Sequence, residues 1–238
     1  MEKLESNMNI VGAGISGLVA ALVLEQEGYS STIYEASDSP GGRVKTDIFK
    51  GYQLDHGFQV LLDAYPMAQK YLDLESLSLQ NFLPGAVIFK DGKKITMGDP
   101  LRNLSLLLPT LLSNIGNISD KVKILKLNLE LKGLSLEDIF SSEETSTLTY
   151  LKNKGFSDAI ISSFFKPFFS GIFLEPNLDT SSRMFQFVYK MFGEGLAVLP
   201  MGGIGAIGIQ LASKLKKSTI NYNSPVQKVL DCKLVLAD

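Results

Sequence analysis

Residues 9–17 read NIVGAGISG, and this stretch decides the expected fold of the chain. Gly12, Gly14 and Gly17 form the pattern G-x-G-x-x-G directly after an apolar run. In such a turn the first glycine permits unusual backbone angles and the second lets a diphosphate approach the backbone. The third lets a helix pack closely on a strand. The pattern therefore predicts a phosphate-binding turn between a buried strand and a helix.

The residues around this turn predict a strand, a helix and a second strand. Apolar residues recur at helical spacing over 15–27, and Gly28 is typical of a helix end. The run STIYE at 31–35 predicts the next strand, so one βαβ unit occupies about thirty residues. Glu35 ends that strand, where a carboxylate accepts both ribose hydroxyls of an adenosine and repels a 2′-phosphate. We expect a dinucleotide site; the alternative is a glycine turn with a surface glutamate.

A second glycine motif follows at 35–43, which reads EASDSPGGR. After G-x-G-x-x-G at this spacing, it resembles the flavin-containing amine oxidase and phytoene desaturase superfamily. The resemblance implies that FAD is the cofactor and that Gly41 and Gly42 pass close to the flavin and pyrophosphate. It also implies that Arg43 lies against the cofactor, where a guanidinium offsets phosphate charge and stacks on a flat ring. The alternative is a Pro-Gly-Gly turn with a solvated arginine.

The resemblance continues in patches. LDHGFQVLLDAYP at 54–66 is similar to the strand beneath the flavin, with Asp55 and Gly57 as structural residues and Phe58 and Gln59 beside the isoalloxazine. His56, the one histidine of the chain, is expected to pack or hydrogen-bond there, with a general base as the alternative.

Two later segments also resemble the superfamily. PMGG at 200–203 leads back to the cofactor domain, and INYNSPVQKV at 220–229 is similar to the strand and turn whose valine lies by the adenine. No catalytic side chain is predicted. The predicted cofactor-binding residues are Gly12, Ala13, Gly14, Ile15, Ser16, Gly17, Glu35, Ala36, Gly41, Gly42, Arg43, Gly57, Phe58 and Val226.

The expected fold class is α/β, with a Rossmann-like FAD-binding domain interrupted by a mostly helical α+β substrate domain. The expected FAD-binding segments are 1–65 and 199–238, and the substrate domain is 66–198. Within the latter, AVIFKDGKKITM predicts a hairpin with a turn at Asp91-Gly92. Helices are expected over 120–140, capped by Ser119 or Asp120, and over 180–192, and the aromatic-rich segment 157–169 is expected to end near Lys166-Pro167.

Family members end with a Gly-Asp motif and a helix aimed at the flavin, and neither follows in this sequence. The resemblance therefore implies that the C-terminal part of the fold is missing from the chain. A separate polypeptide that completes the fold is one expectation, and a truncated, inactive fragment is the other.

Composition excludes several classes of protein. The net charge of −2 indicates no nucleic-acid partner, and a single cysteine gives neither an intrachain disulfide nor a thiolate metal cluster. No metal site is expected. The sequence contains no Gly-x-Ser-x-Gly motif, which would indicate a hydrolase. The apolar run at 104–112 is too short to span a bilayer. We expect a soluble, cytoplasmic protein, with contact at a membrane surface left open.

The aromatic cluster of Phe164, Phe165, Phe168 and Phe169 is expected to form a core, with an apolar substrate tunnel or a membrane contact as alternatives. The expected function is an FAD-dependent oxidoreductase whose flavin accepts a hydride from an organic, apolar substrate. A flavin-dependent isomerase of the carotenoid type is an alternative, and so is NAD in place of FAD.

Overall fold

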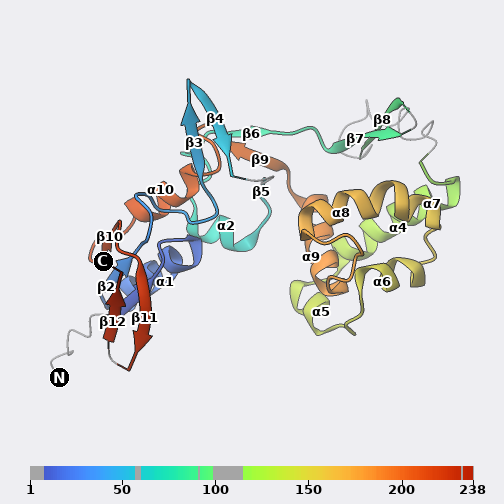
Figure 1. Ribbon diagram of the computed structural model, residues 1–238. Helices are drawn as coiled ribbons and strands as arrows, with labels where there is room; N and C mark the ends of the chain where they lie inside the picture. The colour runs from blue at the N-terminus through green and yellow to red at the C-terminus, as the bar shows by residue number, and fades with distance from the viewer. Residues whose placement is uncertain (1–7, 57–59, 91, 99–114, 232, 238) are drawn as a thin grey trace. The chain divides into compact units, whose positions relative to one another are not determined.

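The computed structural model describes residues 8–56, 60–90, 92–98, 115–231 and 233–237 (Figure 1). The chain divides into two compact units. Unit 1 consists of Met1–Asn81 and Val198–Asp238, and unit 2 is Phe82–Ala197. The first unit is therefore built from two segments that are far apart in the sequence.

The first expected boundary, at residue 65, differs from this division, because residues 66–81 belong to unit 1. Hydrogen bonds to the second segment of unit 1 hold them there. Lys214 Nζ donates to Tyr71 O at 2.6 Å, and Gln210 Nε2 donates to Asp73 O at 2.9 Å. These bonds link positions more than 130 residues apart, which a local sequence pattern does not reveal.

The parallel sheet of unit 1 contains the predicted strand–helix–strand order. Strand β1 (Met8–Val11) is followed by helix α1 (Ile15–Gln26) and strand β2 (Ser31–Tyr34). β2 lies between β1 and β10 (Thr219–Asn221) and pairs in parallel with both. The sequence prediction for 8–35 is confirmed at this level.

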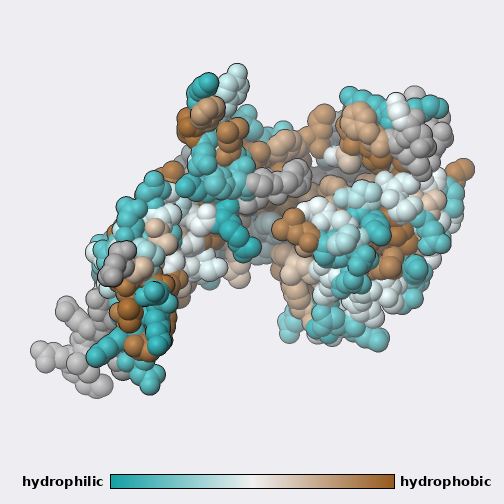
Figure 2. All heavy atoms as spheres, in the orientation of Figure 1, coloured by the Kyte–Doolittle hydropathy of each residue, from teal (hydrophilic) through white to brown (hydrophobic). Residues whose placement is uncertain are grey.

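The other elements of unit 1 are small. The antiparallel pair β3 (Thr46–Phe49) and β4 (Tyr52–Asp55) forms a hairpin with exposed apolar side chains, and hydrophobic residues show on its surface in Figure 2. A three-stranded sheet has the order β5 (Leu61–Leu62), β9 (Ala197–Pro200), β6 (Leu79–Asn81). The helices α2 (Pro66–Tyr71) and α10 (Ala206–Ser213) and the hairpin β11 (Val226–Leu230) and β12 (Lys233–Leu236) complete the unit.

Unit 2 begins with the predicted hairpin and continues as helices. Strands β7 (Gly85–Lys90) and β8 (Lys93–Gly98) pair in antiparallel register, as AVIFKDGKKITM predicted; Asp91 in the expected turn lies outside the described residues. The helical elements are α4 (Ile118–Gly133), α5 (Leu136–Ser141), α6 (Thr147–Asn153), α7 (Asp158–Ile160), the π-helical turn η2 (Ile161–Phe165), α8 (Lys166–Phe173) and α9 (Ser182–Glu194).

Three expected boundaries in unit 2 are wrong: the range of the helix over 120–140, its cap, and the end of the aromatic-rich segment near Lys166-Pro167. Residues 120–140 form two helices rather than one, because Leu134 is extended and Ser135 caps α5. Asn117 caps α4 in a capping box: its side chain accepts a hydrogen bond from Asp120 N, and the Asp120 side chain accepts one from Asn117 N. The helical run also continues past Lys166, and Pro167 lies at the start of α8, directly after the π-helical turn η2.

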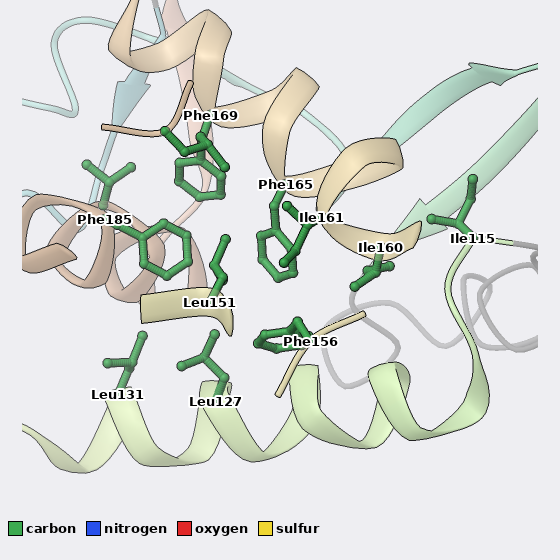
Figure 3. Close-up of a cluster of buried hydrophobic side chains, with 12 residues drawn as sticks. Ile115, Leu127, Leu131, Leu151, Phe156, Ile160, Ile161, Phe165, Phe169 and Phe185 are labelled. Atoms are coloured by element: carbon green, nitrogen blue, oxygen red, sulfur yellow. The ribbon is translucent and has the colours of Figure 1, made fainter. Parts of the chain in front are cut away.

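The aromatic cluster forms the core of unit 2. Phe165, Phe169 and Phe185 are fully or almost fully buried and contact one another, with ring centroids 4.7–6.4 Å apart. Figure 3 shows Leu127 and Leu131 of α4 pointing toward these rings. The predicted hydrophobic core is thus confirmed for Phe165 and Phe169. The apolar run at 104–112 lies outside the described residues.

In the described part of the chain, none of the helices combines the length and the apolar character that crossing a bilayer requires.

Candidate dinucleotide-binding site

The two glycine motifs of unit 1 meet in the structure. Gly14 and Gly41 form a parallel bridge between the turn after β1 and the segment after β2. Gly41 N donates a hydrogen bond to Ala13 O at 2.8 Å. The G-x-G-x-x-G turn and the Gly-Gly-Arg segment therefore form one surface, built from backbone.

The three glycines of the first motif are under different constraints. Gly12 has a φ of +96°, which favours glycine. A Cβ on Gly17 would lie 2.1 Å from Gly12 O, so only glycine allows α1 to start this close to the turn. A Cβ on Gly14 would meet Gly42 Cα at 4.0 Å, an ordinary contact. The protein therefore leaves space beside Gly14 that is large enough for a side chain.

The Gly-Gly pair is held more tightly. Gly41 has a φ of +114° and Gly42 a φ of +62°. A Cβ on Gly42 would lie 3.2 Å from Gly14 Cα, and one on Gly41 would lie 2.3 Å from Val44 O. Both positions therefore favour glycine through backbone angle and space, independently of any ligand.

The N-terminus of α1 opens at this surface. Gly14 is the N-cap residue and supplies no side-chain cap. Two amides of the turn are used within the protein, since Gly12 N donates to Tyr34 O at 2.8 Å and Ala13 N donates to the Glu35 carboxylate. The first-turn amides that follow lie at the positive end of a twelve-residue helix. Such a terminus attracts an anion.

The Glu35 carboxylate faces the glycine turn. Oε2 accepts a hydrogen bond from Ala13 N at 2.6 Å, and Oε1 accepts bonds from Ser37 N and Oγ at 2.8 and 2.7 Å. Burial raises the pKa of Glu35, but these hydrogen bonds outweigh it and lower the pKa below its usual value. The group therefore stays ionised at neutral pH, although the residue is only 8% exposed.

The turn between β10 and β11 closes the other side of Glu35. Glu35 N donates to Asn221 O at 2.9 Å, and Ser224 N donates to Glu35 O at 2.8 Å. Tyr222 lies within this turn, and its pKa is raised by burial and by the Glu35 charge. Val226, the predicted adenine neighbour, begins β11 directly after the turn.

Not every predicted residue is brought into this surface. Gly12–Gly17, Glu35, Gly41 and Gly42 come together, whereas the side chains of Ala36 and Arg43 are exposed. Gly57, Phe58 and Gln59 lie outside the described residues. His56 Nε2 lies 2.7 Å from Asp47 Oδ2 and both side chains are about half exposed, so His56 hydrogen-bonds on the β3–β4 hairpin.

Sequence reasoning missed three residues of this region. Ser37 donates twice to Glu35, Tyr222 lies beside it, and Gly208 of α10 packs on Gly41. A serine two residues after the acid is a local signal for such a turn. Tyr222 lies in the segment 220–229 to which the family resemblance had already pointed, whereas the sequence around Gly208 gives no signal of its approach to Gly41.

Comparison with known proteins identifies the class. The family described as flavin containing amine oxidoreductase matches residues 15–235. The chain belongs to this family, which is a family of FAD-dependent oxidoreductases.

The chain matches individual relatives over only part of their length. Protoporphyrinogen oxidase 2, chloroplastic/mitochondrial, from Arabidopsis thaliana is 26% identical over 92% of this chain and 42% of its own length. An L-amino-acid oxidase from Daboia russelii is 38% identical over 31% of this chain and 15% of its own. The crystal structure of an oxidoreductase from Methanosarcina mazei has a TM-score of 0.69 at 20% identity, covering 98% of this chain and 57% of that one. The chain thus spans about half the length of the relatives that it matches most fully.

The described residues fit the cofactor of the family. The space at Gly14, the uncapped start of α1 and the ionised Glu35 are adjacent parts of one surface. A dinucleotide requires space for its diphosphate, a helix end that binds anions, and a carboxylate that accepts hydrogen bonds from its ribose. Among the described residues, no group of three or more His, Cys, Asp and Glu side chains is arranged to hold a metal ion.

Proposed function

We propose that unit 1 binds FAD and that the protein oxidises an organic, apolar substrate. The observation that carries the proposal is that the open position at Gly14 lies next to the buried, ionised Glu35. The Glu35 carboxylate accepts a hydrogen bond from Ala13 N, which belongs to the same turn as Gly14. A carboxylate oxygen accepts up to two hydrogen bonds, so Oε2 retains capacity for a ribose hydroxyl beside the bond from Ala13. A 2′-phosphate would be repelled by the same charge.

Each part of the surface has a separate task in this proposal. The first-turn amides of α1 hold the pyrophosphate, and the exposed Arg43 offsets its charge. Gly42 presents bare backbone next to Gly14, so that the cofactor lies close to the chain. The turn that carries Tyr222 encloses the adenosine end together with Val226.

The chemistry requires little of the protein's own side chains. When bound, FAD supplies the hydride acceptor, N5 of its flavin. The protein then has to bind the cofactor, hold the substrate against it and exclude water. The partly buried aromatic residues around the core of unit 2 support an apolar substrate, and they include Phe164, Phe168, Phe173 and Phe192.

The proposal is tested by flavin uptake. Purified protein incubated with FAD and passed through a desalting column should retain a yellow colour with flavin absorption bands. Gly14→Val should abolish this retention, because the added methyl groups occupy the position proposed for the pyrophosphate. The φ of −69° and ψ of 172° at Gly14 suit valine, so the chain itself tolerates the change.

Gly133→Val is the matched control. An added Cβ on Gly133 would meet nothing within 4 Å, so a side chain fits there as it does at Gly14, and Gly133 lies in unit 2 at the end of α4. This variant should retain flavin as the wild type does. Equal retention by Gly14→Val and the wild type would place the diphosphate elsewhere.

A further inference from the structure

The start of α10 is bonded to the β3–β4 hairpin through two polar side chains. Asp55 Oδ1 accepts hydrogen bonds from Thr46 Oγ1 at 2.5 Å and from Ile204 N at 3.0 Å. Thr46 Oγ1 in turn accepts a bond from Gly205 N at 2.8 Å. The threonine hydroxyl therefore donates to the carboxylate and accepts from the helix start at the same time. We call this arrangement the Thr46–Asp55 clasp.

The clasp leaves no space for side chains on the partner segment. A Cβ on Gly203 would lie 2.5 Å from Thr46 Oγ1 and 2.9 Å from Asp55 Oδ1. A Cβ on Gly205 would lie 2.8 Å from Thr46 N. The separation between hairpin and helix start is thus fixed by direct backbone approach as well as by hydrogen bonds.

The same helix contacts the Gly-Gly pair one turn further on. A Cβ on Gly208 would lie 2.6 Å from Gly41 Cα, so the backbones of α10 and of this segment touch. Gly41 is bonded to Ala13 O, and Gly42 abuts Gly14. α10 therefore contacts the segment 41–46 at both ends, at Gly41 through packing and at Thr46 through the clasp.

We propose that Thr46 and Asp55 are positioning residues of the cofactor site. They act through α10, which holds the segment 41–46 in a fixed position relative to the glycine turn. Arg43 lies within this segment. The inference rests on the proposed function, because the segment has to be positioned for a ligand at Gly14. Hydrogen bonds that order a binding segment without touching the ligand increase affinity, because a segment that has to become ordered on binding weakens the complex.

The test compares two substitutions of one residue. Thr46→Val has nearly the same shape but removes both hydrogen bonds, whereas Thr46→Ser keeps the hydroxyl. The Kd for FAD, measured by quenching of flavin fluorescence, should rise about tenfold in Thr46→Val and change less than about twofold in Thr46→Ser. The visible circular dichroism of bound FAD should change only in Thr46→Val.

A second readout needs no cofactor. Trypsin cleaves after Arg43 and Lys45, which lie within the segment. In protein without FAD, cleavage at these two bonds, followed by mass spectrometry, should be about tenfold faster in Thr46→Val than in the wild type or Thr46→Ser.

Glu25→Gln controls for general destabilisation. The Glu25 carboxylate on α1 accepts hydrogen bonds from the backbone N–H groups of Lys216, Lys217 and Ser218, and it does not take part in the clasp. This variant should lower the melting temperature yet leave the Kd for FAD and the cleavage at Arg43 unchanged.

Two outcomes separate the inference from the proposed function. If wild type binds FAD and Thr46→Val binds it equally well, or if Glu25→Gln weakens binding as much, the positioning role is overturned. If wild type takes up no FAD, the proposed function fails, and the rate of cleavage after Arg43 alone decides whether the clasp orders the segment.

Discussion

The glycine surface of unit 1 is formed by contacts between backbone segments, whereas the aromatic core of unit 2 is formed by contacts between side chains. In unit 1, Gly14, Gly42 and Gly208 bring three distant segments into direct backbone contact. In unit 2, Phe165, Phe169 and Phe185 fill the space between helices with side chains. The first arrangement brings bare backbone to a surface, and the second fills an interior with rings. In the candidate site, close approach of the backbone depends on the absence of side chains, whereas the core of unit 2 depends on their presence.

The largest expected effect is on the aromatic core. Phe165→Ala should lower the free energy of unfolding of unit 2 by about 3–5 kcal/mol, because it deletes a side chain that is 0% exposed. Urea unfolding followed by circular dichroism measures the change. Phe140→Ala is the control, since Phe140 is 44% exposed and its loss should cost less than about 1 kcal/mol. Equal losses would mean that the rings of the core do not carry the stability of unit 2.

The matching change in unit 1 adds a methyl group instead of deleting a ring. Gly17→Ala should cost up to about 3 kcal/mol, because its Cβ would lie 2.1 Å from Gly12 O and backbone cannot yield easily. Gly14→Ala should leave stability within about 0.5 kcal/mol, since its Cβ meets only an ordinary contact. Thermal unfolding of the protein without FAD compares the two. A stable Gly17→Ala protein would contradict the close approach of α1 to the turn.

Removing the charge of Glu35 sharpens the comparison on the side of the ligand. Glu35→Gln should weaken FAD binding by about 1–3 kcal/mol, because an amide cannot accept at both ends from Ala13 and Ser37 and still receive a ribose hydroxyl. Titration calorimetry measures the Kd. Asp38→Asn, an exposed acid three residues on, is the control and should bind as the wild type does. An unchanged Kd for Glu35→Gln would move the ribose away from this residue.

The smallest expected effect concerns a buried carboxylate in unit 2. Burial raises the pKa of Asp120, but hydrogen bonds from Asn117 and Ser157 outweigh it and lower the pKa. A lowered pKa means that Asp120 stabilises the fold above the pKa of the unfolded chain, about 3.9, and that this contribution is lost as the pH falls through the folded value. Asp120→Asn should therefore cost about 1 kcal/mol at pH 7 and progressively less below about pH 4.

Urea unfolding of wild type and Asp120→Asn at several pH values checks this sign. Ser119→Ala is the matched control, because Ser119 was the other expected cap and the structure gives the cap to Asn117. Its cost should be small and independent of pH. A difference between wild type and Asp120→Asn that grows in acid would contradict the assigned charge state.

Local pattern predicted the elements whose causes are local. The run from β1 to β2 follows from apolar periodicity and glycine spacing, and the β7–β8 hairpin follows from the residues on either side of Asp91-Gly92. The helix break at Leu134 was missed, because Leu134 is itself apolar and the capping serine at 135 reads equally well as a helix surface residue.

The candidate site was predictable where one segment carries the signal. The spacing of Gly12, Gly14, Gly17 and Glu35 is visible in the sequence, and the structure places these residues around one turn. The approach of Gly208 to Gly41 was not predictable, because it depends on where a helix lies that follows more than 160 residues later. Contacts made by the absence of a side chain leave no periodic pattern to read.

The pairing of β6 with β9 has a consequence for synthesis on the ribosome. These strands are the two crossings between the units, joined in register from Leu79 with Pro200 to Asn81 with Val198. All of unit 2 is synthesised between them, so every residue of its aromatic core is in the chain before α10 and β10 are made. A released chain that ends before residue 205 would contain all the residues of unit 2 and a glycine turn that still lacks the helix packed on Gly41.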